Sequence, residues 1–118
     1  KIKEILEAGE IDINSPGAAE RRALHRAAGA NHLDACKYLV LKGATIDQTD
    51  KAGRTPLHWA CISGNLASAC FLIEQGSNIF ASSSSQMTPL HMCAENSSVD
   101  IASLLIEQAG EKKGHMFV

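Results

Sequence analysis

The sequence TPLHWAC at residues 55–61 recurs in two variants, as RALHRAA at 22–28 and as TPLHMCA at 88–94. The three copies lie 33 residues apart, and a fixed period of this length is the signature of a stacked repeat protein. Apolar residues outside the copies keep the same frame, namely Leu33, Leu66 and Val99, then Leu39, Leu72 and Leu105. We therefore expect one domain with repeats at residues 20–52, 53–85 and 86–118 and a partial repeat at residues 1–19.

Each unit carries the signals of two helices separated by a short turn. Thr55 is a good N-cap, and Pro56 suits the first helical position, where its missing N–H is not needed and its fixed φ is already helical. Apolar residues at helical spacing continue until Gly76, which suits a left-handed C-terminal cap. The predicted helices span residues 23–30, 33–42, 56–63, 66–75, 89–96 and 99–108. Since neither helix of a unit can bury its apolar face alone, the units must stack into an all-α solenoid.

These motifs resemble the ankyrin repeat consensus. The resemblance is carried by Thr-Pro-Leu-His-x-Ala-x-x-x-Gly at residues 55–64, by Leu66, by Leu-Ile-x-x-Gly at 72–76 and by the second Thr-Pro-Leu-His at 88–91. It implies stacked units of two antiparallel helices with projecting β-hairpin loops, and a concave surface that binds proteins. It also implies a structural role for the motif residues Leu24, His25, Thr55, Pro56, Leu57, His58, Thr88, Pro89, Leu90 and His91.

Three departures from the consensus have expected consequences. Arg22-Ala23 replaces Thr-Pro in the first full unit, so we expect a softer helix start there. Gln86 stands where the family has the hairpin glycine, and Ser83 stands where Asp50 represents the family aspartate. The third hairpin is therefore expected to be looser or shaped for a particular contact.

The composition argues against several classes of partner and location. The formal charge of the 118 residues is only -2 and the basic residues are scattered, so neither nucleic acid nor a membrane is an expected partner. Since the N-terminus has no signal-peptide pattern, we expect a cytoplasmic or nuclear protein. The four cysteines form no Cys-x-x-Cys pair and occupy Ala-like helical positions, which favours free thiols as small core fillers.

No set of residues indicates catalysis, a cofactor or a metal. His25, His58 and His91 belong to separate layers about 10 Å apart, too far to share an ion whose ligands lie at about 2 Å. The resemblance instead implies that these histidines hydrogen-bond to backbone across a turn. The Ser, Cys and His residues follow the repeat without converging, and no phosphate-binding glycine motif occurs. We expect neither an enzyme nor a small-molecule substrate.

The resemblance places candidate binding residues at the hairpin tips and along the inner helices. These protein-binding candidates are Arg21, Arg26, Thr49, Lys51, Arg54, Trp59, Ile62, Ser63, Met87, Met92, Glu95 and Asn96. Arg26, Trp59 and Met92 share one slot in successive units, which predicts a cationic, aromatic and thioether stripe of hot-spot residue types. Core packing is the competing interpretation of Trp59. A methyl-lysine cage is not expected, because too few aromatic residues are available.

The sequence thus predicts a non-catalytic, monomeric adaptor or targeting module that binds another protein or a peptide segment. The alternative is an intramolecular regulatory or spacer segment of a larger enzyme or channel. We expect the chain to be part of a longer protein, because it begins in the middle of a unit. The serine run at residues 82–85 is either a flexible linker or a phosphorylation site.

Overall fold

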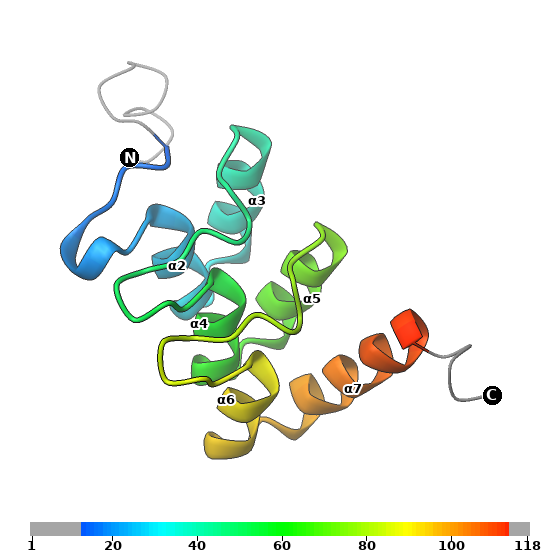
Figure 1. Cartoon of the computed structure of the whole chain (residues 1–118). Coiled ribbons are helices and arrows are strands. Elements are labelled where there is room, and N and C mark those ends of the chain that lie inside the picture. The colour runs from blue at the N-terminus through cyan, green and yellow to red at the C-terminus, as the bar shows by residue number, and fades with distance from the viewer. Residues whose placement is uncertain (1–12, 114–118) are drawn as a thin grey trace.

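The computed structural model describes residues 13–113, with side chains described through residue 110, and consists of helices stacked in pairs (Figure 1). The elements are η1 (Ala18–Glu20), α2 (Ala23–Gly29), α3 (Leu33–Leu41), α4 (Pro56–Ser63), α5 (Leu66–Glu74), α6 (Pro89–Glu95) and α7 (Val99–Lys113). No strand occurs among the described residues. The predicted all-α architecture is therefore confirmed, whereas most of the partial repeat predicted at residues 1–19 lies outside the described residues.

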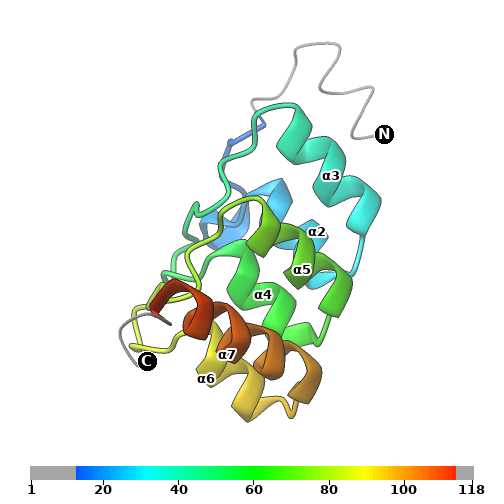
Figure 2. The same ribbon diagram turned by 90° about the vertical axis from the view of Figure 1, so that its right-hand side faces the viewer.

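The helices form two layers. The first helices of the pairs, α2, α4 and α6, pack side by side, and the second helices, α3, α5 and α7, pack side by side behind them (Figures 1 and 2). The loops that join α3 to α4 and α5 to α6 project on the same side of the stack (Figure 1). The result is elongated, with extents of 52 × 26 × 22 Å, as expected when each unit contacts only its neighbours.

The helix ends follow the predicted signals except at the C-terminus. Thr55 Oγ1 accepts a hydrogen bond from the N–H of His58, and Pro56 occupies the first position of α4. At Gly76, φ is 95°, and the Ser77 N–H bonds back to the end of α5, so the glycine ends that helix. The equivalent residue in the third unit is Ala109, which has no glycine-like freedom and favours the helix. For this reason α7 runs to Lys113, beyond the predicted end at residue 108.

The core is a ladder of leucines and small side chains contributed by successive units. Leu57 and Leu72 are fully buried in the central unit, while Leu24 and Leu39 are buried in the unit before it and Leu105 is buried in the unit after it. All four cysteines are free, and Cys36, Cys61 and Cys93 are buried among the leucines. This confirms their predicted role as core fillers, although Cys70 is only partly buried. Burial raises the pKa of the Cys61 thiol far above its usual range.

The motif histidines connect each unit to the next. The Nδ1 of His58 accepts a hydrogen bond from the Thr55 N–H at 3.0 Å, and its Nε2–H donates to the Met87 carbonyl of the following loop at 2.8 Å. His25 makes the same long-range bond to the Arg54 carbonyl at 2.9 Å. The predicted bond from histidine to backbone is thus confirmed. Burial, only partly offset by these bonds, lowers the pKa of both His25 and His58.

The projecting loops contain the same turn in each unit. In residues 17–21, 50–54 and 83–87, the N–H of the first residue donates to the carbonyl of the fifth, at 2.8, 3.0 and 2.9 Å. Neighbouring turns are linked by one backbone bond, from Lys51 N–H to the Ala19 carbonyl in the first pair. These bonds give a hairpin-like turn in place of the β-hairpin strands that the resemblance implied.

The third turn keeps the geometry of the second in spite of its different residues. Ser83 Oγ accepts from the N–H groups of Ser85 and Met87, as Asp50 Oδ1 accepts from those of the equivalent residues in the second turn. Ser83 is buried, so it is part of the turn and not of a flexible linker. Gln86 adopts φ 61°, a left-handed conformation that favours glycine. The substitution is therefore accommodated at the expense of backbone strain, and the predicted loosening is not seen in the hydrogen bonds.

The first full unit begins its helix without a side-chain cap. Arg22 precedes α2, and its side chain has no acceptor for the free N–H groups of the first turn. Its guanidinium instead donates to the carbonyls of Asn14, Glu20 and Thr49. These hydrogen bonds connect the segment before α2 to the neighbouring loop. The N–H of Arg22 still donates to His25 Nδ1 at 3.0 Å, so half of the usual arrangement is kept.

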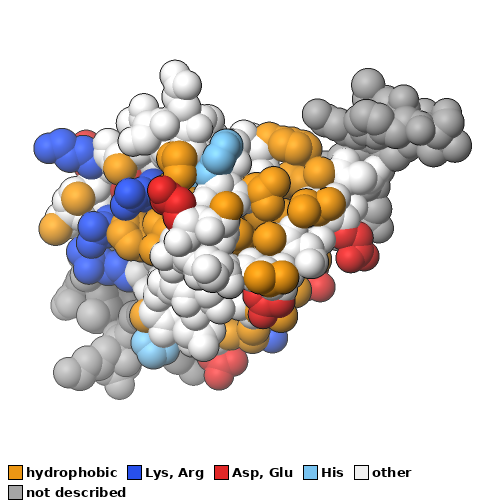
Figure 3. All heavy atoms as spheres, turned by 90° about the horizontal axis from the view of Figure 1, so that it is seen from below, with side chains coloured by type: hydrophobic (Ala, Val, Ile, Leu, Met, Phe, Trp, Pro, Cys, Tyr) orange, Lys and Arg blue, Asp and Glu red, His pale blue; other side chains and the backbone are white. Residues whose placement is uncertain are grey.

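The outer face of the third unit lies uncovered among the described residues. Leu90 is 40% exposed, whereas the equivalent Leu24 and Leu57 are 2% and 0% exposed. Val99 and Ile106 on α7 are 72% and 60% exposed. Figure 3 shows hydrophobic side chains gathered over this end of the stack. The His91 ring is also exposed, because no further described unit packs against it.

Candidate functional site

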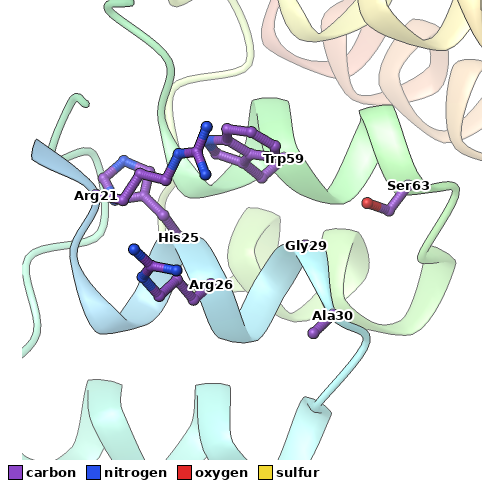
Figure 4. Close-up of a pocket in the computed structure, with 7 residues that line it drawn as sticks. All are labelled: Arg21, His25, Arg26, Gly29, Ala30, Trp59 and Ser63. Atoms are coloured by element: carbon purple, nitrogen blue, oxygen red, sulfur yellow. The ribbon is translucent and has the colours of Figure 1, made fainter. Parts of the chain in front are cut away.

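A pocket opens between α2 and α4 on the face of the first helix layer (Figure 4). Its volume is about 310 Å³, near the lower end of the range for small-ligand sites. The lining residues are Arg21, His25, Arg26, Gly29, Ala30, Trp59 and Ser63. Four of the predicted binding candidates, three of them with hot-spot side chains, therefore line one pocket.

Trp59 forms the centre of this site and is held in position by its neighbours. Its Nε1–H donates to Asp50 Oδ2 at 2.9 Å. The Arg21 guanidinium carbon lies 4.6 Å from the ring centroid and that of Arg54 lies 5.4 Å from it, both within cation–π range. Arg21 and Arg54 occupy equivalent positions of successive turns, so the repeat itself brings two guanidinium groups to one indole.

Asp50 is the buried carboxylate that anchors this arrangement. Its Oδ1 accepts from the N–H groups of Ala52 and Arg54, both at 2.9 Å, while its Oδ2 accepts from Trp59. Burial alone would raise the pKa of Asp50, but these three hydrogen bonds outweigh it and the pKa is lowered. The ionised carboxylate therefore fixes both the turn and the indole.

The two arginines of the pocket differ in their surroundings. Arg21 is half-buried against the indole, and its Nε is buried without a hydrogen-bond partner. Arg26 is exposed on α2, and neither arginine forms an ion pair with an acidic side chain among residues 13–110. Figure 4 shows both guanidinium groups on the loop side of the pocket, with Ala30 and Ser63 at the other side. The pocket is thus basic and aromatic at one end and small and uncharged at the other.

The predicted stripe of Arg26, Trp59 and Met92 is not continuous on the surface. Met92 is only 4% exposed and belongs to the hydrophobic core, so the expectation of an accessible thioether there was wrong. A flexible, unbranched side chain without a charged or strongly polar group can fold down into the core. The exposed part of the stripe is therefore Arg26 and Trp59.

The remaining candidates lie outside the pocket. Thr49 and Lys51 are exposed in the second loop, while Ile62 and Met87 are partly buried. Glu95 and Asn96 are exposed at the end of α6. These residues are spread over the loop side and the inner helices, so they could contact only a partner larger than the pocket.

Asp50, which was not predicted as a binding candidate, contributes to the site, as does Gly29, which aligns with the candidate Ile62. Asp50 stands out in the sequence only as a consensus residue, although it is the hydrogen-bond acceptor that orients Trp59. Gly29 leaves the indole accessible, because a Cβ there would lie 3.6 Å from two Trp59 carbons. The repeat alignment places Gly29 on the inner helix, but its distance to the next unit depends on how the units stack.

Among the described residues, no group of three or more His, Cys, Asp or Glu side chains is arranged to hold a metal ion. Within the same residues, no helix combines the length and apolar character needed to cross a bilayer.

The stacked helix pairs, the repeated turns and the pocket between α2 and α4 define a helical repeat scaffold with a lateral pocket. The family model described as ankyrin repeats (3 copies) matches residues 1–83 and 24–116. The chain belongs to the ankyrin repeat family, whose members are generally protein–protein interaction modules.

A more limited similarity links the chain to a curated protein. It is 37% identical over 46 residues to alpha-latrocrustotoxin-Lt1a of Latrodectus tredecimguttatus. The matched stretch is 39% of this chain and 3% of the toxin, so the chain spans only a small part of that protein.

Proposed function

We propose that this domain is a non-catalytic adaptor that binds a peptide segment of another protein across α2, α4 and the second loop. The observation that carries the proposal is the pocket in which Arg21, Arg26 and Trp59 converge. Trp and Arg are the residue types that most often dominate binding energy at protein interfaces. Their side chains are neither buried in the core nor used to join two units by backbone bonds.

The rigidity of the pocket also supports a binding role. Trp59 is fixed by one hydrogen bond and two guanidinium contacts, so little side-chain entropy is lost when a partner packs on it. Gly29 has no side chain to cover the part of the indole that faces the pocket. A structural tryptophan of the core would need neither the open glycine nor the exposed arginine beside it.

A peptide display screen with the 118-residue chain tests the proposal. Peptides enriched on the wild-type domain are re-measured on Arg26→Glu, with Lys37→Glu as the matched control on the second helix layer. Both substitutions replace a positive charge with a negative one. Because both residues are exposed on helices, neither substitution should affect folding much. We expect Arg26→Glu alone to lose at least about tenfold in affinity, which corresponds to about 1.4 kcal/mol.

The Trp59→Ala variant separates a contact role from a packing role. If Trp59 is a contact, this variant keeps the helical circular dichroism of the wild type and loses the peptides. If it unfolds, Trp59 has a packing role and the contact role is rejected. If the enriched peptides bind Arg26→Glu and wild type equally, the pocket is not the binding surface.

A further inference from the structure

We propose that the basic end of the pocket binds the carboxylate of a Glu or Asp side chain in the partner segment. This inference rests on the proposed function, and it adds the chemistry of the residue that the pocket selects. The carboxylate would lie between the Arg21 and Arg26 guanidinium groups, beside the indole of Trp59.

The Arg21 guanidinium is prepared for such a ligand. Stacking on the indole at 4.6 Å holds it in one orientation, so its planar fork is already ordered before binding. Its Nε is buried and has no hydrogen-bond partner, which is an unfavourable state for a charged donor. A carboxylate beside the guanidinium would offset this charge and can accept two parallel N–H bonds from one guanidinium.

Among residues 13–110, no acidic side chain forms an ion pair with Arg21 or Arg26. Asp50 is the nearby acidic residue of the site, and its oxygens already accept bonds from Trp59, Ala52 and Arg54. The chain as a whole carries a formal charge of -2, yet Lys and Arg side chains gather on the loop side of the stack (Figure 3). The local field is therefore basic in an otherwise slightly acidic domain, which favours a negatively charged partner segment.

The charged donors that line the pocket are the guanidinium groups of Arg21 and Arg26, which can bind a carboxylate bidentately. Phosphate sites generally use free backbone N–H groups at a helix start or in a turn. Here the N–H of Arg21 is bonded to the Ala18 carbonyl and that of Arg22 to His25 Nδ1. These two N–H groups are therefore not available to a ligand, whereas the guanidinium fork matches the planar carboxylate.

A methylated lysine is disfavoured at the same place. Two guanidinium groups already lie within cation–π range of the Trp59 ring. A methylated lysine would be repelled by these two positive charges, and no aromatic cage is available to compensate for the repulsion. The uncharged end of the pocket, at Gly29 and Ala30, suits a small apolar neighbour of the acidic residue.

Positional peptide pools test the inference directly. Acetylated and amidated twelve-residue peptides carry Glu, Gln, phosphoserine or trimethyl-lysine at the central position, with all other positions randomised. Amidation removes the terminal carboxylate of each peptide, so a carboxylate effect at the central position can come only from a side chain. Because the chain has a single tryptophan, quenching or shift of Trp59 fluorescence reports occupancy of this pocket.

We expect the Glu pool to bind about tenfold more tightly than the Gln pool, and to weaken as salt is raised. Arg21→Lys, which keeps the charge and removes the fork, should lose most of this preference, as should Arg26→Gln. Lys37→Gln removes the same charge on α3 and should leave the preference unchanged. Circular dichroism of each variant shows that the fold is kept.

Three results overturn the inference. Equal binding of the Glu and Gln pools would show that the pocket does not recognise a carboxylate. Stronger binding of the phosphoserine pool would show that it recognises a phosphate instead. An equal loss of preference in Lys37→Gln would show that the preference depends only on the overall charge of the domain. In each case, peptides that still depend on Trp59 would leave the proposed function standing. If no pool and no displayed peptide binds the wild-type domain, the proposed function fails as well.

Discussion

Replacing His58 by alanine should destabilise the domain far more than the same change at His91. The two residues share one motif, but His58 is fully buried and His91 is exposed. His58→Ala loses the bonds to the Thr55 N–H at 3.0 Å and to the Met87 carbonyl at 2.8 Å, each contributing about 1 kcal/mol. The cavity left at this site adds roughly 1–2 kcal/mol, so the total is about 3–4 kcal/mol.

His91→Ala loses mainly the bond from the Thr88 N–H at 3.0 Å, at a site where water can replace it. We expect a loss of about 1 kcal/mol or less, so the two variants should differ by about 2–3 kcal/mol. Urea unfolding measures both free energies, with far-UV circular dichroism and Trp59 fluorescence as independent probes of one transition. Equal destabilisation of the two variants would show that the bond between units contributes little, and would refute the reasoning.

Three further outcomes follow from individual sites. The pKa of His58 is lowered in the folded state, so below about pH 6.5 the unfolded chain binds a proton that the folded chain does not. The urea concentration at the unfolding midpoint should therefore decrease as the pH is lowered from about 7 to about 5, and it should decrease less steeply in His58→Gln. Gln86→Gly should raise the unfolding free energy by about 1 kcal/mol, because glycine adopts a φ of 61° without strain. Gly53→Ala should lower the unfolding free energy, because the new Cβ would lie 2.8 Å from the Ser84 backbone nitrogen. An unchanged thermal midpoint for both variants would contradict this. Under native conditions a thiol reagent should modify Cys70 first and Cys61 last, and mass spectrometry of digested protein would expose the reverse order.

The period of 33 residues is sufficient by itself to predict the architecture. Thr55, Pro56 and Gly76 act on backbone groups within a few residues of themselves, so the helix ends they define can be predicted locally. The same frame requires the units to stack, because each helix has an apolar face that only a neighbouring unit can cover. Even the extension of α7 follows from one local change, the alanine at position 109 in place of glycine.

The site could be predicted only in part. The alignment of the repeats places Arg21, Arg26 and Trp59 among the candidates, because equivalent positions of a repeat share a face. It also places Met92 there, yet Met92 is buried while Trp59 is only partly buried. Equivalent backbone positions do not give equivalent exposure, since side-chain length, polarity and the neighbouring layer differ from unit to unit.

What the sequence alone determined is therefore the repeated backbone, in which short-range signals and one period fix the helices and their order. Tertiary structure alone decided that Asp50 orients Trp59, that Arg21 of one unit stacks on the indole of the next, and that an Arg21 nitrogen is left without a partner. These contacts join different units, so they depend on the distance and rotation between layers. Many sequences share the period, but each set of side chains fills the space between layers in its own way.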